Sequence, residues 1–241
     1  MIQTVLFDLG STLIYAKDAW TDYFRQGDEA LVDVLQKAGI PLSGRIFFEE
    51  YGSFIDRYYA QFAPQDTTER TALSALEEIL AEKGYPNIPP SVLRAALKAL
   101  YAVTNQNWCA EKDALPTLDV LKKSGFRLGL ISNTSDDAHV QTLIDENGFR
   151  PYFEFVVTSA GFGIRKPDRR IFQIALDHFQ ARPESAAMVG DTLDADILGA
   201  NDLGIYSIWI TRRASVANPA IIPQATISTL QEIPSLLKKI Q

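Results

Sequence analysis

The sequence is poor in cysteine and in long apolar runs. Cys109 is the single cysteine among 241 residues, so no internal disulfide can form, and a reducing cytoplasm is the expected compartment. No stretch reaches the roughly 18 consecutive apolar residues that a membrane helix needs. The opening residues, MIQTVLFDLG, have neither a basic segment nor a small-residue cleavage site, so they do not resemble a signal peptide. We therefore expect a cytoplasmic protein that does not enter a membrane.

Positive charge is also scarce. The chain has 23 Lys and Arg against 30 Asp and Glu, which gives a formal net charge of −7 at pH 7. Proteins that bind DNA, RNA or anionic membranes attract them with basic patches, so these partners are not expected. A composition of 46% hydrophobic and 22% charged residues is that of an ordinary folded protein and argues against disorder.

The hydrophobic pattern changes twice along the chain. Residues 2–7 are a short apolar run that predicts a buried strand. Residues 17–104 have the spacing of amphipathic helices, expected at 28–40, 70–85 and 89–103. After residue 113, helical segments alternate with short strands, which we expect at 126–132, 153–159, 186–191, 205–211 and 225–228. This alternation is typical of βαβ units and of a parallel sheet covered on both faces.

The pattern therefore predicts an α/β fold with two domains. Residues 1–14 and 114–241 would form a doubly wound, mostly parallel, Rossmann-like core. Residues 15–113 would form an all-helical domain inserted after the first strand. Within it, residues 66–68 are expected to cap the second helix, and Pro89 with Pro90 to start the third.

Polar side chains follow four of the expected strands. In a parallel α/β sheet, ligands bind beyond the carboxyl ends of the strands. The residues found there are Asp8, Ser132, Asn133, Lys166, Asp191, Asp194 and Asp196. Each alone is typical of a turn or a helix cap, but together they combine carboxylates that suit Mg²⁺ with a hydroxyl, an amide and an ammonium that suit a phosphate. The combination favours phosphoryl chemistry.

Four motifs at these strand ends resemble a known family. FDLGSTL, ISNT, RKPD and VGDTLDAD occur in the order of the four motifs of the haloacid dehalogenase superfamily of hydrolases. The helical insertion after the first motif resembles the helical cap of one subgroup, which selects the substrate. The resemblance covers the whole chain and implies a phosphatase that acts on a small phosphorylated metabolite.

The resemblance implies a role for each matching residue. Asp8 matches the nucleophile that forms an aspartyl-phosphate. Ser132 and the amide of Asn133 match the phosphate-binding groups, and Lys166 matches the lysine that offsets negative charge on the nucleophile and the phosphoryl oxygens.

A second set of matches concerns the metal. Asp8, the backbone carbonyl of Gly10 and Asp191 match the Mg²⁺ ligands, and Asp196 matches an outer carboxylate that orients the metal's waters or the lysine. Two carboxylates and a trianionic transition state need such positive charge beside them.

One position departs from the family pattern. The usual first motif is Asp-x-Asp, and its second aspartate transfers protons, whereas this chain has Gly10 there. Loss of a positioned acid or base costs about 10²- to 10⁴-fold in rate, most severely for alkyl esters whose leaving group needs a proton. Thr12, Asp194, a cap residue or water are the available substitutes, and the sequence selects none of them.

Two other functions stay open. Gly10 is compatible with a non-catalytic or weakly active protein that binds a phosphorylated ligand. A 2-haloacid dehalogenase would use the same aspartate on carbon without a metal, but the cluster around Asp191 favours Mg²⁺ and phosphate; a phosphomutase would need the missing second aspartate. Aromatic residues are frequent between positions 15 and 62, and among them Tyr15 and Trp20 are candidates to line a substrate cleft, although packing is their commoner role.

Overall fold

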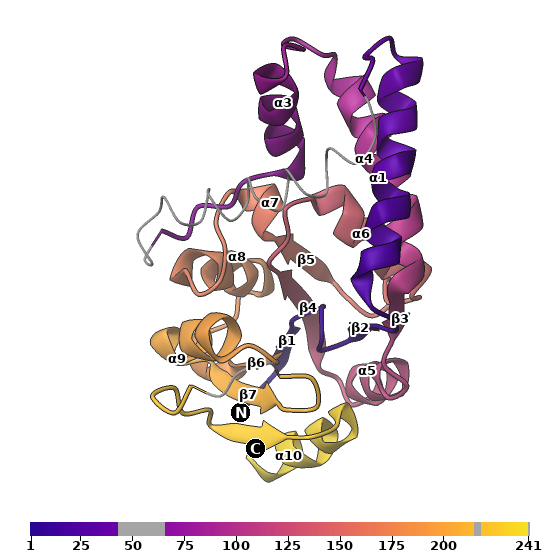
Figure 1. The fold of residues 1–241 in the computed structure, drawn as a ribbon. Coiled ribbons are helices and arrows are strands. Elements are labelled where there is room, and N and C mark those ends of the chain that lie inside the picture. Colours follow the sequence, from indigo (N-terminus) through magenta and orange to yellow (C-terminus); the bar gives the residue numbers. More distant parts are fainter. Residues whose placement is uncertain (43–65, 215–217, 241) are drawn as a thin grey trace. The chain divides into compact units, whose positions relative to one another are not determined.

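The computed structural model describes residues 1–42, 66–214 and 218–240 (Figure 1). The contacts between residues divide the chain into two compact units. The first unit consists of Met1–Tyr15 and Cys109–Gln241, and the second is Ala16–Trp108. The second unit is thus inserted between two pieces of the first.

The first unit contains a six-stranded sheet in which every pairing is parallel. Across the sheet, the strands are β5 (Phe155–Thr158), β4 (Arg127–Ser132), β1 (Thr4–Phe7), β6 (Ala186–Gly190), β7 (Tyr206–Ile210) and β8 (Ala225–Ile227). The predicted α/β fold with a parallel, doubly wound sheet is confirmed. Each expected strand is present, with ends that differ by up to two residues.

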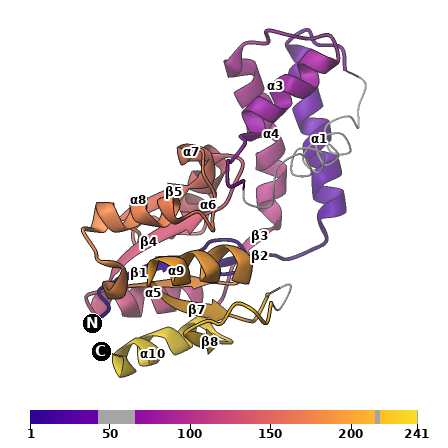
Figure 2. The ribbon, with the colours of Figure 1, turned by 90° about the vertical axis from the view of Figure 1, so that its left-hand side faces the viewer.

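Helices cover both faces of this sheet (Figures 1 and 2). The helices are α5 (Ala114–Lys123), α6 (Asp137–Glu146), α7 (Ser159–Phe162), α8 (Arg169–Phe179), α9 (Leu198–Leu203) and α10 (Ile233–Lys239). A π-helical turn, Leu193–Ile197, precedes α9, and 3₁₀ turns lie at Pro183–Ser185 and Leu230–Glu232. Helices α8 and α9 lie on one face, and α5, α6 and α10 on the other.

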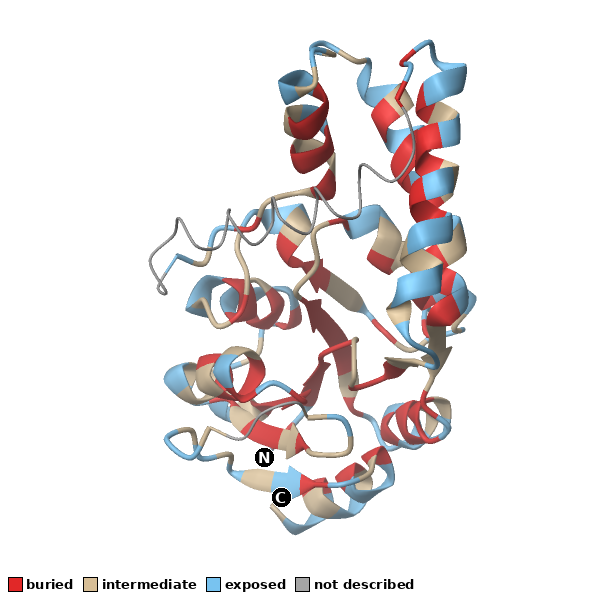
Figure 3. Ribbon diagram, in the orientation of Figure 1, coloured by how far each residue is buried: buried red, intermediate tan, exposed pale blue. Residues whose placement is uncertain are grey.

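The four inner strands, β1, β4, β6 and β7, are buried along most of their length, whereas the edge strands β5 and β8 are partly buried (Figure 3). Alternate residues of the central strands, such as Leu6, Ile131 and Met188, join Phe172 and Leu176 of α8 in one hydrophobic cluster. Side chains on a strand alternate between the two faces, so the intervening residues pack against the opposite helices. This explains why the strands read as continuous apolar runs rather than as an alternating pattern.

The order of the strands fixes where a ligand can bind. From β1 the chain moves to β4 and then to β5 at one edge, whereas β6, β7 and β8 extend from the other side of β1. The direction of winding therefore reverses between β1 and β6, and a crevice forms beyond the carboxyl ends of strands at such a point. Asp8 follows β1 and Asp191 follows β6, which places both at this crevice.

Two short strands that the sequence pattern did not indicate connect the units. They are β2 (Ile14–Ala16) and β3 (Trp108–Ala110), which pair with each other. At three residues each, β2 and β3 are too short to have a detectable period. Tyr15 of β2 also contacts an arginine of the first unit, because the guanidinium carbon of Arg213 lies 3.9 Å from the centre of the Tyr15 ring.

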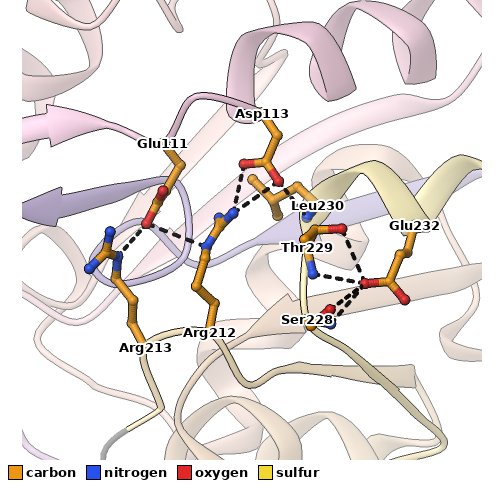
Figure 4. A network of polar contacts seen from close by, with 8 residues as sticks. All are labelled: Glu111, Asp113, Arg212, Arg213, Ser228, Thr229, Leu230 and Glu232. Carbon is orange, nitrogen blue, oxygen red and sulfur yellow. Dashed lines mark hydrogen bonds and ion pairs between the residues drawn. The ribbon is translucent and has the colours of Figure 1, made fainter.

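A network of charged residues follows β3 (Figure 4). Arg212 donates from Nη1 to both carboxylate oxygens of Asp113, at 3.0 and 2.9 Å, and the backbone N–H of Leu230 donates to Asp113 Oδ2 at 2.9 Å. Glu111 accepts a hydrogen bond from Arg213. Glu111 and Asp113 are both buried, and buried carboxylates need such paired partners.

In the second unit, the described helices are α1 (Trp20–Lys37), α3 (Ala72–Glu82) and α4 (Pro90–Thr104), with a 3₁₀ turn at Asn105–Asn107. Gly27 of α1 allows a close approach to α4, since a Cβ at this position would lie 3.2 Å from the carbonyl oxygen of Leu100. Leu31 and Leu35 of α1 pack in one cluster with Leu97 of α4.

The helix ends agree only partly with expectation. Helix α4 begins at Pro90 after Pro89, which confirms that prediction. The cap expected for α3 at residues 66–68 was wrong, because Thr71 is the N-cap and accepts a hydrogen bond from the N–H of Ser74. The aromatic residues of positions 47–62 lie outside the described residues. None of the helices that the structure describes combines the length and apolar character needed to cross a membrane.

Candidate active site

A buried lysine side chain lies among the polar groups at or after the ends of β1, β4 and β6. Lys166 Nζ donates hydrogen bonds to Asp8 Oδ1 at 2.7 Å, to Asp196 Oδ1 at 2.6 Å and to the backbone carbonyl of Ile131 at 2.8 Å. The three donors of the ammonium group are thereby used. Lys166 is 3% exposed and Asp196 1%, so these charges are almost fully withdrawn from water.

Burial and neighbouring charges oppose each other at this lysine. Burial alone lowers the pKa of the Lys166 ammonium, but the adjacent carboxylates of Asp196 and Asp8 outweigh it and raise that pKa above its usual value. The lysine is therefore a permanent positive charge at neutral pH. It is suited to stabilise negative charge and unsuited to accept a proton.

Asp191 completes a cluster of three acidic side chains. One carboxylate oxygen from each of Asp8, Asp191 and Asp196 lies within 4.8 Å of the others. Burial, followed by repulsion from Asp8 and Asp196, raises the pKa of Asp191 to about 7. Burial likewise raises the pKa of Asp196 to about 6, although Lys166 acts in the opposite direction. Three buried carboxylates against one ammonium leave two excess negative charges when all are ionised.

The turn after β6 is shaped around Asp196. The N–H of Thr192 donates to Asp196 Oδ2 at 3.0 Å, and a Cβ on Gly190 would lie 2.3 Å from the Asp196 carboxyl carbon. Position 190 therefore requires glycine for space. On the neighbouring strand, Trp209 Nε1 donates to the backbone carbonyl of Asp191 at 2.8 Å and fixes the start of this turn.

The loop after β4 is tied to the lysine through its backbone. The Asn133 side chain accepts a hydrogen bond from the Lys166 N–H at 2.8 Å and donates to the Lys166 carbonyl at 3.1 Å. Ser132, the last residue of β4, is buried beside it. Asn133 thus holds the segment that carries Lys166, a role for its side chain that the sequence pattern did not indicate.

The loop after β1 is compact. The N–H groups of Leu13 and Ile14 both donate to the Leu9 carbonyl, at 2.8 and 3.0 Å. The left-handed residue of this loop is Ser11, with φ of 59°, rather than Gly10. Thr12 is fully buried, and its hydroxyl has no hydrogen-bond partner among the residues that the structure describes.

The substitute proton donors named from the sequence lie in different surroundings. Asp194 is exposed and accepts a hydrogen bond from Asn218 at 2.8 Å.

The aromatic candidate Trp20 is packed against other rings in the helical unit. It is half-buried, and its ring centroid lies 5.0 Å from that of Phe24 and 5.1 Å from that of Trp108. These contacts favour a packing role for Trp20.

The donor set fits a hard cation beside a phosphate. Carboxylate and carbonyl oxygens are the ligands that Mg²⁺ prefers, and a cation would offset the two excess negative charges of the cluster. The structure brings together Asp8 and Asp191 from the ends of β1 and β6, Asp196 from the π-helical turn after β6, and Lys166 from the loop before α8. Ser132 is the last residue of β4 and Asn133 follows it, directly after Ile131, whose carbonyl accepts a hydrogen bond from the same lysine.

Comparison with known proteins agrees with this arrangement. The family model described as "haloacid dehalogenase-like hydrolase" matches residues 2–204. A glyceraldehyde 3-phosphate phosphatase of Methanothermobacter thermautotrophicus is 30% identical over 227 residues, which cover 90% of this chain and 89% of that protein. A phosphoserine phosphatase of Thermus thermophilus is 34% identical over 112 residues, which cover 46% of this chain and 45% of that protein.

The fold is also found in solved structures. A 2-haloacid dehalogenase from Pseudomonas syringae pv. Tomato DC3000 superimposes with a TM-score of 0.73 over 100% of both chains, at 24% sequence identity. Such identity establishes a shared fold and leaves the choice of reaction to the side chains of the site. The family model extends over most of the chain and includes all four strand-end motifs, and so the chain belongs to the haloacid dehalogenase-like hydrolases.

Proposed function

We propose that this hydrolase is a Mg²⁺-dependent phosphatase that acts on a small phosphorylated metabolite through an aspartyl-phosphate on Asp8. The observation that carries the proposal is the buried contact of 2.7 Å between Lys166 Nζ and Asp8 Oδ1. A carboxylate that attacks phosphorus must approach an anionic substrate, and a fixed positive charge beside it reduces their repulsion.

The reaction would proceed in two displacements. An oxygen of Asp8 attacks phosphorus, the bond between phosphorus and the ester oxygen breaks, and the leaving alkoxide takes up a proton from water. A water molecule then attacks the phosphorus of the aspartyl-phosphate and loses a proton to the solvent, the bond to the Asp8 oxygen breaks, and inorganic phosphate leaves. Ser132 and the N–H of Asn133 would bind the phosphoryl oxygens, while Lys166 offsets their charge.

The metal would be held by side chains of the acidic cluster. Asp8, Asp191 and the backbone carbonyl of Gly10 are the proposed ligands, and Mg²⁺ supplies positive charge for the phosphoryl oxygens when bound. Asp196 would act from outside the ligand set, because its two oxygens already accept hydrogen bonds from Lys166 and from the Thr192 N–H.

Gly10 limits the range of good substrates. Without a carboxylic acid at this position, leaving groups that need no proton should react best, which favours acyl and aryl phosphates over alkyl phosphates. The same glycine supports the second candidate, a protein that binds a phosphorylated ligand with little or no turnover. Residues 16–108 are proposed to select the substrate.

Phosphate release tests the proposal directly. The substrates would be p-nitrophenyl phosphate, acetyl phosphate and a panel of alkyl phosphates, with Mg²⁺ or with EDTA, and Asp8→Asn would serve as the control variant. We expect turnover that requires Mg²⁺ and is lost in Asp8→Asn. Folded protein that binds phosphate without hydrolysing even acetyl phosphate would favour the binding protein, and chloride release from 2-chloropropionate would favour the dehalogenase.

A further inference from the structure

The end of the edge strand β5 holds the loop after β4 with a serine outside the four motifs. Ser159 is fully buried at the first position of α7. Its Oγ accepts the backbone N–H of Thr134 at 2.7 Å and donates to the backbone carbonyl of Thr134 at 2.9 Å. One hydroxyl group thereby fixes the two peptide groups on either side of the Thr134 Cα atom.

These peptide groups belong to the loop that carries Ser132 and Asn133. The Thr134 N–H is part of the peptide group that joins Asn133 to Thr134, so Ser159 fixes the carboxyl side of Asn133. The Asn133 side chain is fixed by the backbone of Lys166. Asn133 is therefore held from two directions, by the segment after β5 and by the segment that carries Lys166.

A neighbouring contact strengthens the same corner. Thr158 pairs in register with Ser132, and its Oγ1 donates to Asp137 Oδ1 at 2.7 Å at the start of α6. The last residue of β5 and the first residue of α7 thus bind the helix and the loop that follow β4. The loop therefore lies between β4, which pairs with β5, and α6, whose first residue accepts a hydrogen bond from the end of β5.

We propose that Ser159 is a positioning residue for phosphate binding, which acts by orienting the Asn133–Thr134 peptide so that Ser132 and the Asn133 N–H face the phosphoryl group. This inference rests on the proposed function of the site. Because the Thr134 N–H is engaged by Ser159, Ser132 and the Asn133 N–H are the groups of this loop that we assign to the phosphate. A misplaced donor costs binding energy even when the fold is intact.

The chain offers a matched control in Ser207. Ser207 is also fully buried, donates from its hydroxyl to Asn201 Oδ1 at 2.7 Å and accepts the N–H of Gln224 at 3.1 Å. It pairs with Met188 in the interior of the sheet rather than at a carboxyl end. Ser159→Ala and Ser207→Ala therefore remove similar hydrogen bonds, but only the first alters the loop.

The experiment measures the binding of inorganic phosphate to the full chain by calorimetry in the presence of Mg²⁺, together with the Mg²⁺-induced rise in melting temperature. We expect Ser159→Ala to weaken phosphate binding about tenfold, the equivalent of one lost hydrogen bond, and to leave the Mg²⁺-induced rise unchanged. Ser159→Thr, which keeps the hydroxyl, should restore most of the affinity. Ser207→Ala should lower the melting temperature and bind phosphate as the wild type does.

The outcomes separate the two proposals. Phosphate binding by Ser159→Ala at wild-type strength, or equal weakening in Ser207→Ala, overturns the role of Ser159 and leaves the proposed function intact. A wild-type protein that binds no phosphate overturns both. If Ser159→Ala does not fold, Ser159→Cys preserves the shape with weaker hydrogen bonds, and the same comparison applies to it.

Discussion

Lys166 donates a hydrogen bond to Asp8 across 158 positions of the sequence, at 2.7 Å, and the same ammonium group reaches Asp196 at 2.6 Å. The Lys166 ammonium group therefore compensates the negative charge of two buried carboxylates at once. Removing one partner of a buried ion pair is more damaging than removing both, because the remaining charge is left without compensation.

Replacement of Lys166 by methionine should destabilise the protein strongly. Lys166→Met leaves Asp8 and Asp196 buried without their cation, at a cost of about 3–5 kcal/mol in the free energy of unfolding. The loss should shrink toward pH 5, because burial raises the pKa of Asp196 to about 6 and, without Lys166 to oppose this, its carboxylate takes up a proton more readily in the folded than in the unfolded state. Urea unfolding at several pH values measures both effects.

An exposed lysine provides the control for this change. Lys123 pairs with Asp119 at 2.7 Å, and its side chain is 76% exposed. Lys123→Met should change the free energy of unfolding by less than about 1 kcal/mol at any of these pH values. Similar losses in the two variants would mean that the buried lysine is not a partner that the acids require.

The stability of the metal-free protein should fall as the pH rises from about 4 to about 7. The pKa of Asp191 is raised to about 7 and that of Asp196 to about 6, against a usual value of 3.8. Within this window the folded state binds more protons than the unfolded state, so stability decreases with increasing pH. Mg²⁺ competes with these protons and should restore stability where the acids are ionised.

Melting curves with Mg²⁺ and with EDTA test this expectation. The Mg²⁺-induced rise in melting temperature should be small at about pH 5 and should grow until about pH 8. Asp191→Asn should reduce the rise at every pH. A rise of the same size throughout would contradict the assignment of the metal to these carboxylates.

Gly190 should not tolerate a side chain. The Cβ of Gly190→Ala would lie 2.3 Å from the carboxyl carbon of Asp196 and would displace that carboxylate from Lys166. We expect a loss of about 1–3 kcal/mol in stability and at least a tenfold loss of phosphatase turnover. Gly129→Ala is the control, since its Cβ would meet the side chains of Phe179 and Leu6 at 2.7 and 2.9 Å. It should lose similar stability and keep its turnover per folded molecule.

An aspartate at position 10 should widen the range of substrates. Ser11 is the left-handed residue of the loop, so Gly10→Asp does not require an unfavourable φ at position 10. If the new carboxyl group protonates the leaving oxygen, kcat/KM for alkyl phosphates should rise by about 10²-fold, and that for p-nitrophenyl phosphate should change little. Gly10→Asn, of similar size but unable to transfer the proton, should show no gain. Equal effects of the two variants would contradict a missing acid.

The sequence predicted the sheet well because its strands are continuous apolar runs between helical segments, and Asp8 and Asp191 could be placed from strand ends alone. Strands β2 and β3 were missed because each has three residues. The side-chain role of Asn133 was also missed, since its contact with Lys166 joins residues 33 positions apart. The available sequence signal for Ser159 was its hydroxyl group, directly after β5, the strand that pairs with the one ending at Ser132.

The position of β1 in the sheet has a consequence for the order in which the protein is made. Strand β1 pairs with residues 127–130 on one side and 186–189 on the other. Because synthesis runs from the amino end, β1 leaves the ribosome before the residues that form β4 and β6 have been made. The apolar segment before Asp8 must therefore remain unpaired until β4 has been made, and exposed apolar strands of this kind are prone to aggregate during folding.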